Sequence, residues 1–378
     1  MNHKLDDWLN GFTALYMKQG KSNFKAEIAK LFKFDEKTVV VGARINEWCQ
    51  TIDEVNDLLL SQLSDYQYEF NFDQADIYET SGQAFISSIG RVSKKVLSSI
   101  VLDDTIAKSL DVLSTEVSDQ SKAFKASRTI AEALIDLELG ENYCFPLRFS
   151  VFLVEEDDYF KASHMQFSFD AEFLWQHRYL KMDDLKESHK LPHRADSEEI
   201  RSLLSKLQQG YTNRDQGVID DYMTLFSGDD HMMAIGTDFG EYLKGHEAVK
   251  EMIVSDWEYW GDFRLDIDGA VITEFEEAAF FTTKASIHQT HDESVMEDSA
   301  VKLMTYKLED ETMPKKMRLL EALKATLALH YEKSLGKDYY APMRFSGYLI
   351  KCNNQWKVQY LQFSDHIISP EKRQSVCS

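Results

Sequence analysis

The apolar positions of this chain follow two periods, and the order of the periods occurs twice along the sequence. In the second half, apolar residues recur at the spacing of one helix face, at Ile200, Leu203, Leu204, Leu207 and Tyr211. Shorter helices are expected at 218–226 and 246–260, with a short apolar strand between them. The first half has matching helical stretches at 24–32 and 52–66. The first half also begins with an amphipathic helical stretch ahead of these two, so three helices are predicted at the start of each half.

After each set of helices the period of the apolar residues changes to two. Residues 264–274 and 277–287 alternate as antiparallel strands do. In each half the last two predicted strands form a hairpin, at 147–168 and at 343–364. Asp157-Asp158 and Asn353-Asn354 mark the two reversals, since Asp and Asn side chains favour turns.

The two halves are copies of one another. Residues 139–168 and 335–364 share twelve identical residues in thirty, where average residue usage predicts roughly two by chance. A period near 195 residues suits a duplicated domain. We predict a first copy at 1–170, a linker at 171–196 and a second copy at 197–368. Between its strands each copy inserts a segment of helical period, at about 94–140 and about 290–336.

Composition narrows the class of protein. The formal net charge of −22 argues against a nucleic-acid or anionic-membrane partner, because both need a basic surface. The N-terminus lacks the basic start and apolar core of a signal peptide, and no apolar run approaches the roughly eighteen residues of a membrane span. The four cysteines show no CxxC spacing. We expect a cytoplasmic protein with free thiols.

The order of helices and strands resembles the SnoaL-like branch of the nuclear transport factor 2-like superfamily. Two stretches carry the resemblance: IGTDFGEYLKGHEAVKEMI at 235–253, and the closing hairpin RFSGYLIKCNNQWKVQYLQFS at 344–364. The first copy repeats both more loosely, with Glu47-Trp48 in place of Glu241-Tyr242. The final strand departs from the family pattern His-x-His. It has His164 and Gln166 in the first copy and, at 360 and 362, tyrosine and glutamine in the second.

The resemblance implies an α+β fold of two tandem cone-shaped domains. In each, N-terminal helices pack on a curved antiparallel sheet, a cystatin-like roll, and each copy carries its inserted helical segment. Sheets of this superfamily commonly pair face to face as homodimers. We therefore expect the duplication to form an intramolecular pseudo-dimer, with further homo-oligomers possible in principle. Strands apolar on both faces support this, because each face then needs cover.

The resemblance also implies a small-ligand pocket in each cone. The candidate pocket residues are aromatic or polar side chains near the predicted mouths, namely Trp48, Tyr66, Arg148, His164, Gln166, Tyr242, Trp257, Trp260, Arg344, Tyr360 and Gln362. Each has a structural alternative. The arginines could bind a ligand carboxylate or an internal carboxylate, and the rings could line a pocket or fill a core.

His164 is the weak catalytic candidate, since an imidazole can act as acid or base near neutral pH; the alternative is a buried, hydrogen-bonded structural histidine. HQTHDE at 288–293 has no remote third ligand of known spacing and indicates no metal site. GxxxxGK, GxGxxG and GxSxG are absent from the sequence, so we predict no cofactor.

Three functions remain from different classes. The first, which the unlike final strands favour, is binding or sensing of a small molecule without catalysis. The second is a lyase or isomerase acting on a small polycyclic or hydroxylated substrate. The third is an assembly module whose cones are filled by its own side chains.

Overall fold

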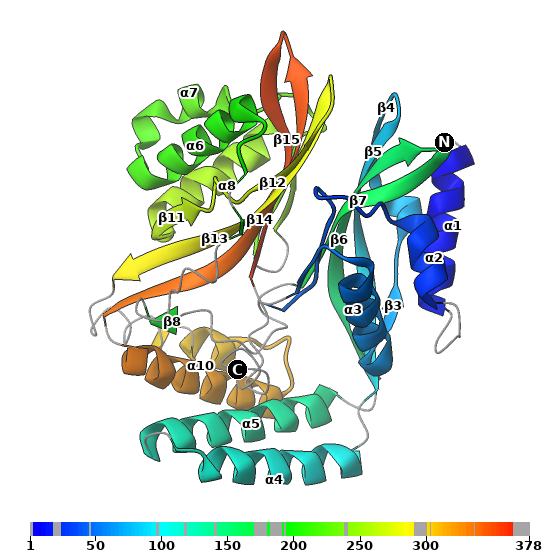
Figure 1. Cartoon of the computed structure of the whole chain (residues 1–378). Coiled ribbons are helices and arrows are strands. Elements are labelled where there is room, and N and C mark those ends of the chain that lie inside the picture. Colours follow the sequence, from blue (N-terminus) through cyan, green and yellow to red (C-terminus); the bar gives the residue numbers. More distant parts are fainter. Residues whose placement is uncertain are drawn as a thin grey trace.

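Two sheets of the same strand order make up the framework of the protein. The computed structural model describes residues 3–17, 24–44, 47–95, 98–116, 119–139, 142–169, 180–181, 191–192, 194–237, 241–290, 301–302, 304–335 and 337–365. The first sheet has the order β2-β1-β7-β6-β5-β3, and the second has the order β10-β9-β15-β14-β13-β11. Figure 1 shows the sheets facing one another, with helices on their outer sides.

The strands of the first sheet are β1 Val39–Val41, β2 Trp48–Cys49, β3 Gln67–Glu69, β4 Asp76–Thr80, β5 Gln83–Lys95, β6 Asn142–Glu156 and β7 Tyr159–Phe169. Those of the second are β9 Met233–Ile235, β10 Tyr242–Lys244, β11 Asp262–Leu265, β12 Val271–Glu274, β13 Ala278–Thr290, β14 Asp338–Cys352 and β15 Gln355–Asp365, with β8 Leu180–Lys181 pairing β14. In the first sheet the short strand β4 also pairs with β5. In the second sheet the equivalent short strand β12 pairs with β13.

The predicted helices are present in both copies. The first sheet carries α1 His3–Met17, α2 Phe24–Leu31 and α3 Ile52–Asp65, and the second carries α6 Glu198–Asn213, α7 Ile219–Met223 and α8 His246–Tyr259. Short 3-10 turns occur at Phe72–Gln74 and Gln216–Val218. Helix α3 begins with a capping box, in which the Thr51 side chain accepts from the Glu54 amide and Glu54 binds the Thr51 amide. The prediction of an α+β fold in two copies is confirmed.

The two closing hairpins also agree with the sequence. Asp157 and Asp158 have φ of 51° and 67°, and Asn353 and Asn354 have φ of 50° and 59°. Such positive values at both central residues define the type I′ reversal, which Asn and Asp tolerate better than most residues do. Each hairpin then contains a β-bulge at the equivalent place, where Ser163 of β7 and Gln359 of β15 are the extra residues in the pairing with β6 and β14.

Helices from both predicted insertions pack together beyond one end of the sheets. They are α4 Ser98–Ser114, α5 Asp119–Leu139 and α10 Lys315–Leu335. Ile135 of α5 packs with Met317 and Leu320 of α10, and Lys316 Nζ lies 2.6 Å from Glu138 Oε2. Figure 1 shows these helices as a layer below both sheets. They therefore connect the two copies through segments that lie far apart in the sequence.

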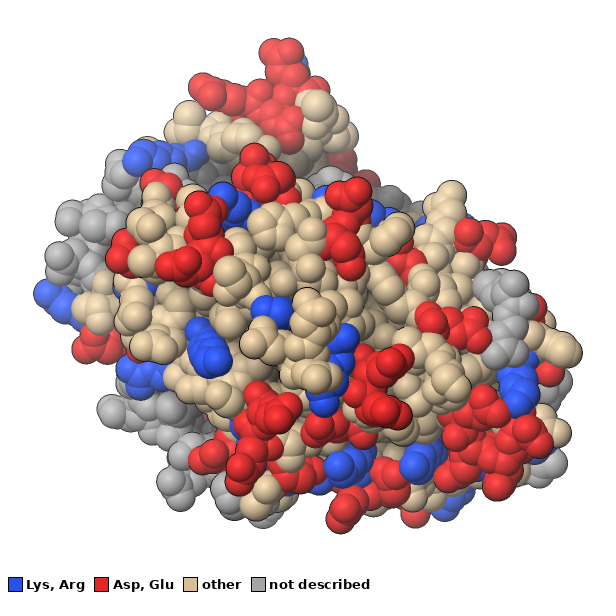
Figure 2. All heavy atoms as spheres, turned by 90° about the horizontal axis from the view of Figure 1, so that it is seen from above, with Lys and Arg blue, Asp and Glu red and all other residues tan. Residues whose placement is uncertain are grey.

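The outer surface reflects the charge of the chain. Figure 2 shows aspartate and glutamate spread widely over the face seen from above, with lysine and arginine scattered among them. No helix in the described ranges is both long and apolar enough to span a membrane. Cys49, Cys144 and Cys352 are free thiols, and Cys377 lies outside the described residues. Most of the predicted linker, 171–196, also lies outside them.

Candidate functional site

The alternation of side chains along β6, β7, β14 and β15 decides where each candidate residue lies. Phe149 and Phe167 point toward the helices and join the first core, as Phe345 and Phe363 join the second. Successive side chains of a strand point to opposite faces of a sheet. Their sequence neighbours therefore point toward the other sheet, where Phe85, Phe152, Phe280, Tyr348 and Tyr360 form a separate core cluster. We call this layer the intersheet layer.

Glutamines and serines meet at the centre of the intersheet layer. Gln362 Nε2 donates to Ser168 Oγ, and Ser150 Oγ donates to Gln362 Oε1, both at 2.8 Å. Gln166 Nε2 donates to Ser364 Oγ, also at 2.8 Å. All five side chains are buried, so these bonds replace water for groups that would otherwise be costly to bury. Gln166 and Gln362 thus join the sheets.

The two predicted site arginines also cross between the copies. Arg148 Nη1 donates to the carbonyl of Gly236, and Arg344 Nη1 donates to the carbonyl of Gly42. Gly42 directly follows β1, which pairs with β7, and Gly236 directly follows β9, which pairs with β15. The two glycines are therefore equivalent in the two copies. Arg344 also donates from Nη2 to the Asp365 carbonyl at 2.5 Å. Backbone carbonyls thus serve as partners of these buried guanidinium groups, an arrangement the sequence did not predict.

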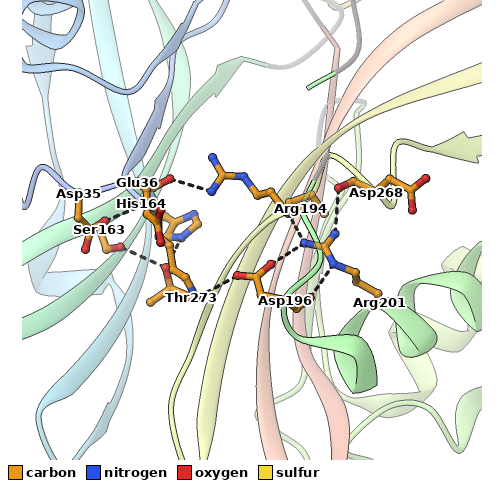
Figure 3. A network of polar contacts seen from close by, with 11 residues as sticks. Asp35, Glu36, Ser163, His164, Arg194, Asp196, Arg201, Asp268 and Thr273 are labelled. Atoms are coloured by element: carbon orange, nitrogen blue, oxygen red, sulfur yellow. Dashed lines mark hydrogen bonds and ion pairs between the residues drawn. The ribbon is translucent and has the colours of Figure 1, made fainter. Parts of the chain in front are cut away.

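His164 is a buried structural residue in this layer. Its Nε2 lies 2.8 Å from the hydroxyl of Thr273, on β12 of the second copy, and Ser163 lies beside it (Figure 3). Its ring packs 5.0 Å from Phe280. Burial lowers the pKa of His164 to about 3; the nearby carboxylate of Asp35 opposes this shift, and the charges of Arg194 and Lys37 add to it. The imidazole is therefore neutral across the physiological range, as the structural alternative requires.

Tyr360, the equivalent of His164, has a different partner. Its hydroxyl donates to Gln362 Oε1 at 2.8 Å, and its ring packs 4.6 Å from Phe85 of the first sheet. Burial raises the pKa of the Tyr360 hydroxyl well above its usual value. Both members of the pair therefore stabilise the contact between sheets, although they do so through different groups.

The pH dependence of stability is expected to report on His164. Its pKa is about 3 in the folded protein and about 6.5 when unfolded, so the unfolded state alone takes up a proton as pH falls below 6.5. The free energy of unfolding should then fall by about 2 kcal/mol between pH 6.5 and pH 5. Urea titrations at several pH values measure this loss, which His164→Gln should abolish.

A variant of the partner separates titration from packing. Thr273→Val removes the hydroxyl that contacts Nε2 while leaving the imidazole buried. This variant should have a lower free energy of unfolding than the wild type at every pH. The change of that free energy with pH should be the same as in the wild type. Since the half-buried His288 also has a lowered pKa and is present in all three proteins, the comparison rests on differences between variants. If the free energy of unfolding changed equally with pH in the wild type and in His164→Gln, His164 would not be the source of the pH dependence.

The interiors of both cones are packed with aromatic rings. In the first copy, Phe12 of α1 lies with its ring centroid 5.3 Å from Phe149 and 5.1 Å from Phe70. Phe149 in turn lies 5.5 Å from Phe167. The chain of contacts runs from the helix through the space under the sheet to its central strands. Within the described residues, side chains of the protein thus occupy the middle of the first cone.

The second cone is packed in the same way with different rings. Tyr211 of α6 lies 5.1 Å from Phe263, and Phe345 lies 4.9 Å from Phe363. The predicted pocket residue Trp260 lies 5.3 Å from Phe363. Its neighbour Trp257 is 4% exposed and belongs to the same core. Tyr66, the third candidate on the helix side, packs against the first core.

The remaining two candidates lie on short strands at the edge of each sheet. Trp48 of β2 packs against Val271 of the second copy, and Lys284 Nζ lies 5.6 Å from the centre of its ring. Tyr242 of β10 donates from its hydroxyl to Asp76 of the first copy at 2.5 Å. Both aromatic residues therefore contact the opposite copy.

The structure does not bring the predicted site residues into one pocket in each cone. Three of them lie on the helix side of their sheets: Tyr66, Trp257 and Trp260. The other eight lie between the sheets or at the edges of that layer: Trp48, Arg148, His164, Gln166, Tyr242, Arg344, Tyr360 and Gln362. The sequence prediction assigned these positions to the cone because the family resemblance implies a small-ligand pocket at its mouth. The second sheet supplies the partners that make their burial favourable.

The sequence reasoning missed the serines and Thr273. Ser150 and Ser168 have identical counterparts at 346 and 364, one residue after each core phenylalanine. A serine preserved in both copies beside a core residue was a usable signal for a polar contact on the opposite face. The described part of the chain holds no cluster of three or more histidine, cysteine or acidic residues arranged for a metal. Of HQTHDE, 291–293 lie outside that part.

Residues 200–312 match the sequence profile of the SnoaL-like domain. This region of the chain is similar to the SnoaL-like domain. This match agrees with the sequence resemblance of the second copy to the SnoaL-like family. The first copy has the same strand order as the second copy, which contains this region. No curated protein matches the chain.

Three solved structures similar to this chain each correspond to less than half of it. An NTF2-like protein of unknown function from Shewanella oneidensis is 14% identical, with 44% of this chain and 98% of that one aligned at a TM-score of 0.27. A cystatin-like protein of unknown function from Nostoc punctiforme is 12% identical, with 48% and 98% aligned at 0.29. A putative dehydratase of the NTF2-like family from Streptomyces avermitilis is 9% identical, with 45% and 96% aligned at 0.30.

Proposed function

We propose that this protein is a non-catalytic assembly module, an intramolecular pseudo-dimer of two SnoaL-like cones filled by their own side chains. The observation that carries the proposal is the continuous ring packing in each cone, from Phe12 to Phe167 and from Tyr211 to Phe363. A ligand of a few hundred daltons needs a cavity of about 300 Å³ or more. Rings in mutual contact occupy that space.

The state of His164 supports a non-catalytic role. A general base works best when its pKa lies near the operating pH and when it can reach a substrate. The pKa of His164 is about 3, and its ring is 1% exposed between two sheets. Tyr360, at the equivalent position, hydrogen-bonds to Gln362 in the same layer. Neither residue is placed for the lyase or isomerase chemistry that the sequence left open.

The intersheet contacts support an internally paired molecule. Ser150, Gln166 and Ser168 of one sheet are hydrogen-bonded to partners on the other sheet. The faces that would pair two separate copies are thus occupied within one chain. We therefore expect a monomer in solution, with any partner binding at the outer surface.

Native mass spectrometry beside the denatured mass tests this proposal. The expected result is a single species of 43.8 kDa with the same mass before and after denaturation. A non-covalent adduct of a few hundred daltons that is lost on denaturation would instead support small-molecule binding in a cone. A species of twice the chain mass would contradict the internally paired monomer. Turnover of a hydroxylated polycyclic substrate that disappears in His164→Ala would overturn the non-catalytic role.

A further inference from the structure

A groove of about 340 Å³ opens at one rim of the intersheet layer. One wall is β4 of the first copy, including Asp76, Tyr78 and Glu79, and the other wall comes from the second copy. That second wall includes Tyr348 and Gln359, and Asp229 lies at its edge. The groove lies outside both cones, so it is independent of the proposed function.

The charge of the groove favours a cation. Three of its lining residues, Asp76, Glu79 and Asp229, are carboxylates. Asp76 already binds the Tyr242 hydroxyl and Lys244 Nζ, the latter at 2.8 Å. Asp229 accepts hydrogen bonds from the His231 amide and from Gln359 Nε2, at 2.8 and 3.0 Å, but has no lysine or arginine partner among the described residues.

Gln359 supplies a second and independent indication. It is 2% exposed and lines the groove, and its Oε1 has no hydrogen-bond donor in the described part of the structure. Its orientation is fixed, because exchanging the amide oxygen and nitrogen would place Oε1 against the carboxylate of Asp229. A buried acceptor without a donor is costly and uncommon. A ligand with N–H groups would satisfy it.

Because the two copies are equivalent, the opposite rim of the intersheet layer contains the counterparts of the groove residues. Strand register makes Thr273 the equivalent of Tyr78, since each lies opposite a phenylalanine of the long strand, Phe280 or Phe85. Ser163, at the β-bulge of the first copy, is the equivalent of Gln359. At the opposite rim, lysine and arginine side chains of the protein lie close to these positions.

Three basic side chains occupy the opposite rim. Arg194, just before the second copy, donates from Nη1 to the Glu36 carbonyl at 2.9 Å, and Figure 3 shows its guanidinium group near His164. Lys33 Nζ lies 2.9 Å from the carboxylate of Asp35, the equivalent of Asp229, and Lys37 pairs with Asp196 at 3.1 Å. In the groove the corresponding acceptors are Asp229 and Gln359, which have no lysine or arginine partner among the described residues, since Lys244 pairs with Asp76.

We propose that the groove binds an alkylguanidinium group, held by Asp229 and by the orphan oxygen of Gln359. A planar guanidinium has five N–H donors in a fixed fork, which suits a carboxylate and an amide oxygen presented together. The rings of Tyr78 and Tyr348, whose centroids lie 5.8 Å apart, provide the aromatic surface that such a cation favours. The group belongs to a free metabolite or to an arginine side chain of a partner.

Calorimetric titration with matched probes tests the proposal. Butylguanidinium should bind the full-length protein at one saturable site, whereas butylurea, its neutral analogue, should not bind. A capped Gly-Arg-Gly peptide distinguishes the sources: tighter binding than butylguanidinium identifies a partner's arginine, and weaker binding identifies a free small molecule. Gln359→Leu should weaken binding about tenfold, as expected when a hydrogen bond to a charged group is lost.

Equivalent residues at the opposite rim provide the controls. Ser163→Ala and Asp35→Asn change the counterparts of Gln359 and Asp229 and should leave butylguanidinium binding unchanged, while Asp229→Asn should weaken it. Circular dichroism establishes that each variant is folded. The absence of saturable binding at millimolar butylguanidinium would overturn the proposal. So would equal binding of butylurea, or affinity that is unchanged in both Gln359→Leu and Asp229→Asn.

Discussion

Replacing Arg344 with methionine is expected to lower the free energy of unfolding by about 4 kcal/mol, because buried carbonyl groups of both copies lose their donor. The guanidinium is fully buried and donates to the carbonyls of Gly42 and Asp365, with Phe167 O at 3.3 Å from Nη1. Each buried acceptor left without a partner costs about 1–3 kcal/mol. Methionine fills much of the volume but donates no hydrogen bond. Urea unfolding followed by circular dichroism measures the change.

Two further arginine variants test the reason for this loss. Arg344→Lys keeps a positive charge but cannot present a planar fork to two carbonyls, so its stability should lie between those of wild type and Arg344→Met. Arg91→Met removes an exposed arginine of β5 that pairs with Glu69, and should leave the unfolding midpoint unchanged. A loss below about 1 kcal/mol in Arg344→Met would show that the carbonyls find other donors.

Replacing Phe149 with alanine is expected to destabilise the protein by about 3–5 kcal/mol and to create a cavity in the first cone. Phe149 is completely buried, and its ring contacts those of Phe12, Phe70 and Phe167. Cavities lined by apolar side chains stay dry and bind small aromatic molecules. Benzene should therefore raise the melting temperature of the variant and leave that of the wild type unchanged.

An exposed aromatic residue of the adjacent strand provides the control. Tyr159, at the start of β7, is 64% exposed, so Tyr159→Ala should change stability by less than about 0.5 kcal/mol. The result that contradicts a filled cone is specific: stabilisation of the wild type by benzene would show that space for a ligand already exists. Because this measurement needs no knowledge of a natural ligand, it tests the proposed function independently of mass spectrometry.

The sequence was sufficient to predict the fold because its signals were local and occurred twice. The helical and alternating periods and the Asp-Asp and Asn-Asn reversals occur in corresponding places of the two copies. The family resemblance then supplied the curvature and the face-to-face pairing that periodicity cannot provide.

The site could not be predicted because its residues lie on strands that are apolar on both faces. Phe149 and Val151 point toward the helices, whereas Phe152 and Val154 point toward the other sheet. The alternation of apolar residues therefore could not show whether the Arg148 side chain points toward the helices or toward the other sheet. The role of Arg194 was beyond prediction for another reason, since its partner carbonyl at Glu36 lies 158 positions away in the chain.

The connection of both sheets in one chain has a consequence for how the protein responds to dilution. The hydrogen bond between Ser150 and Gln362 joins residues 212 positions apart, yet both belong to one molecule. Linking two binding surfaces covalently replaces their bulk concentration by an effective concentration that does not change with expression level. A homodimer of single cones would separate when scarce. This protein is expected to keep its two sheets paired at any cellular abundance, so its intersheet groove is complete in every folded copy.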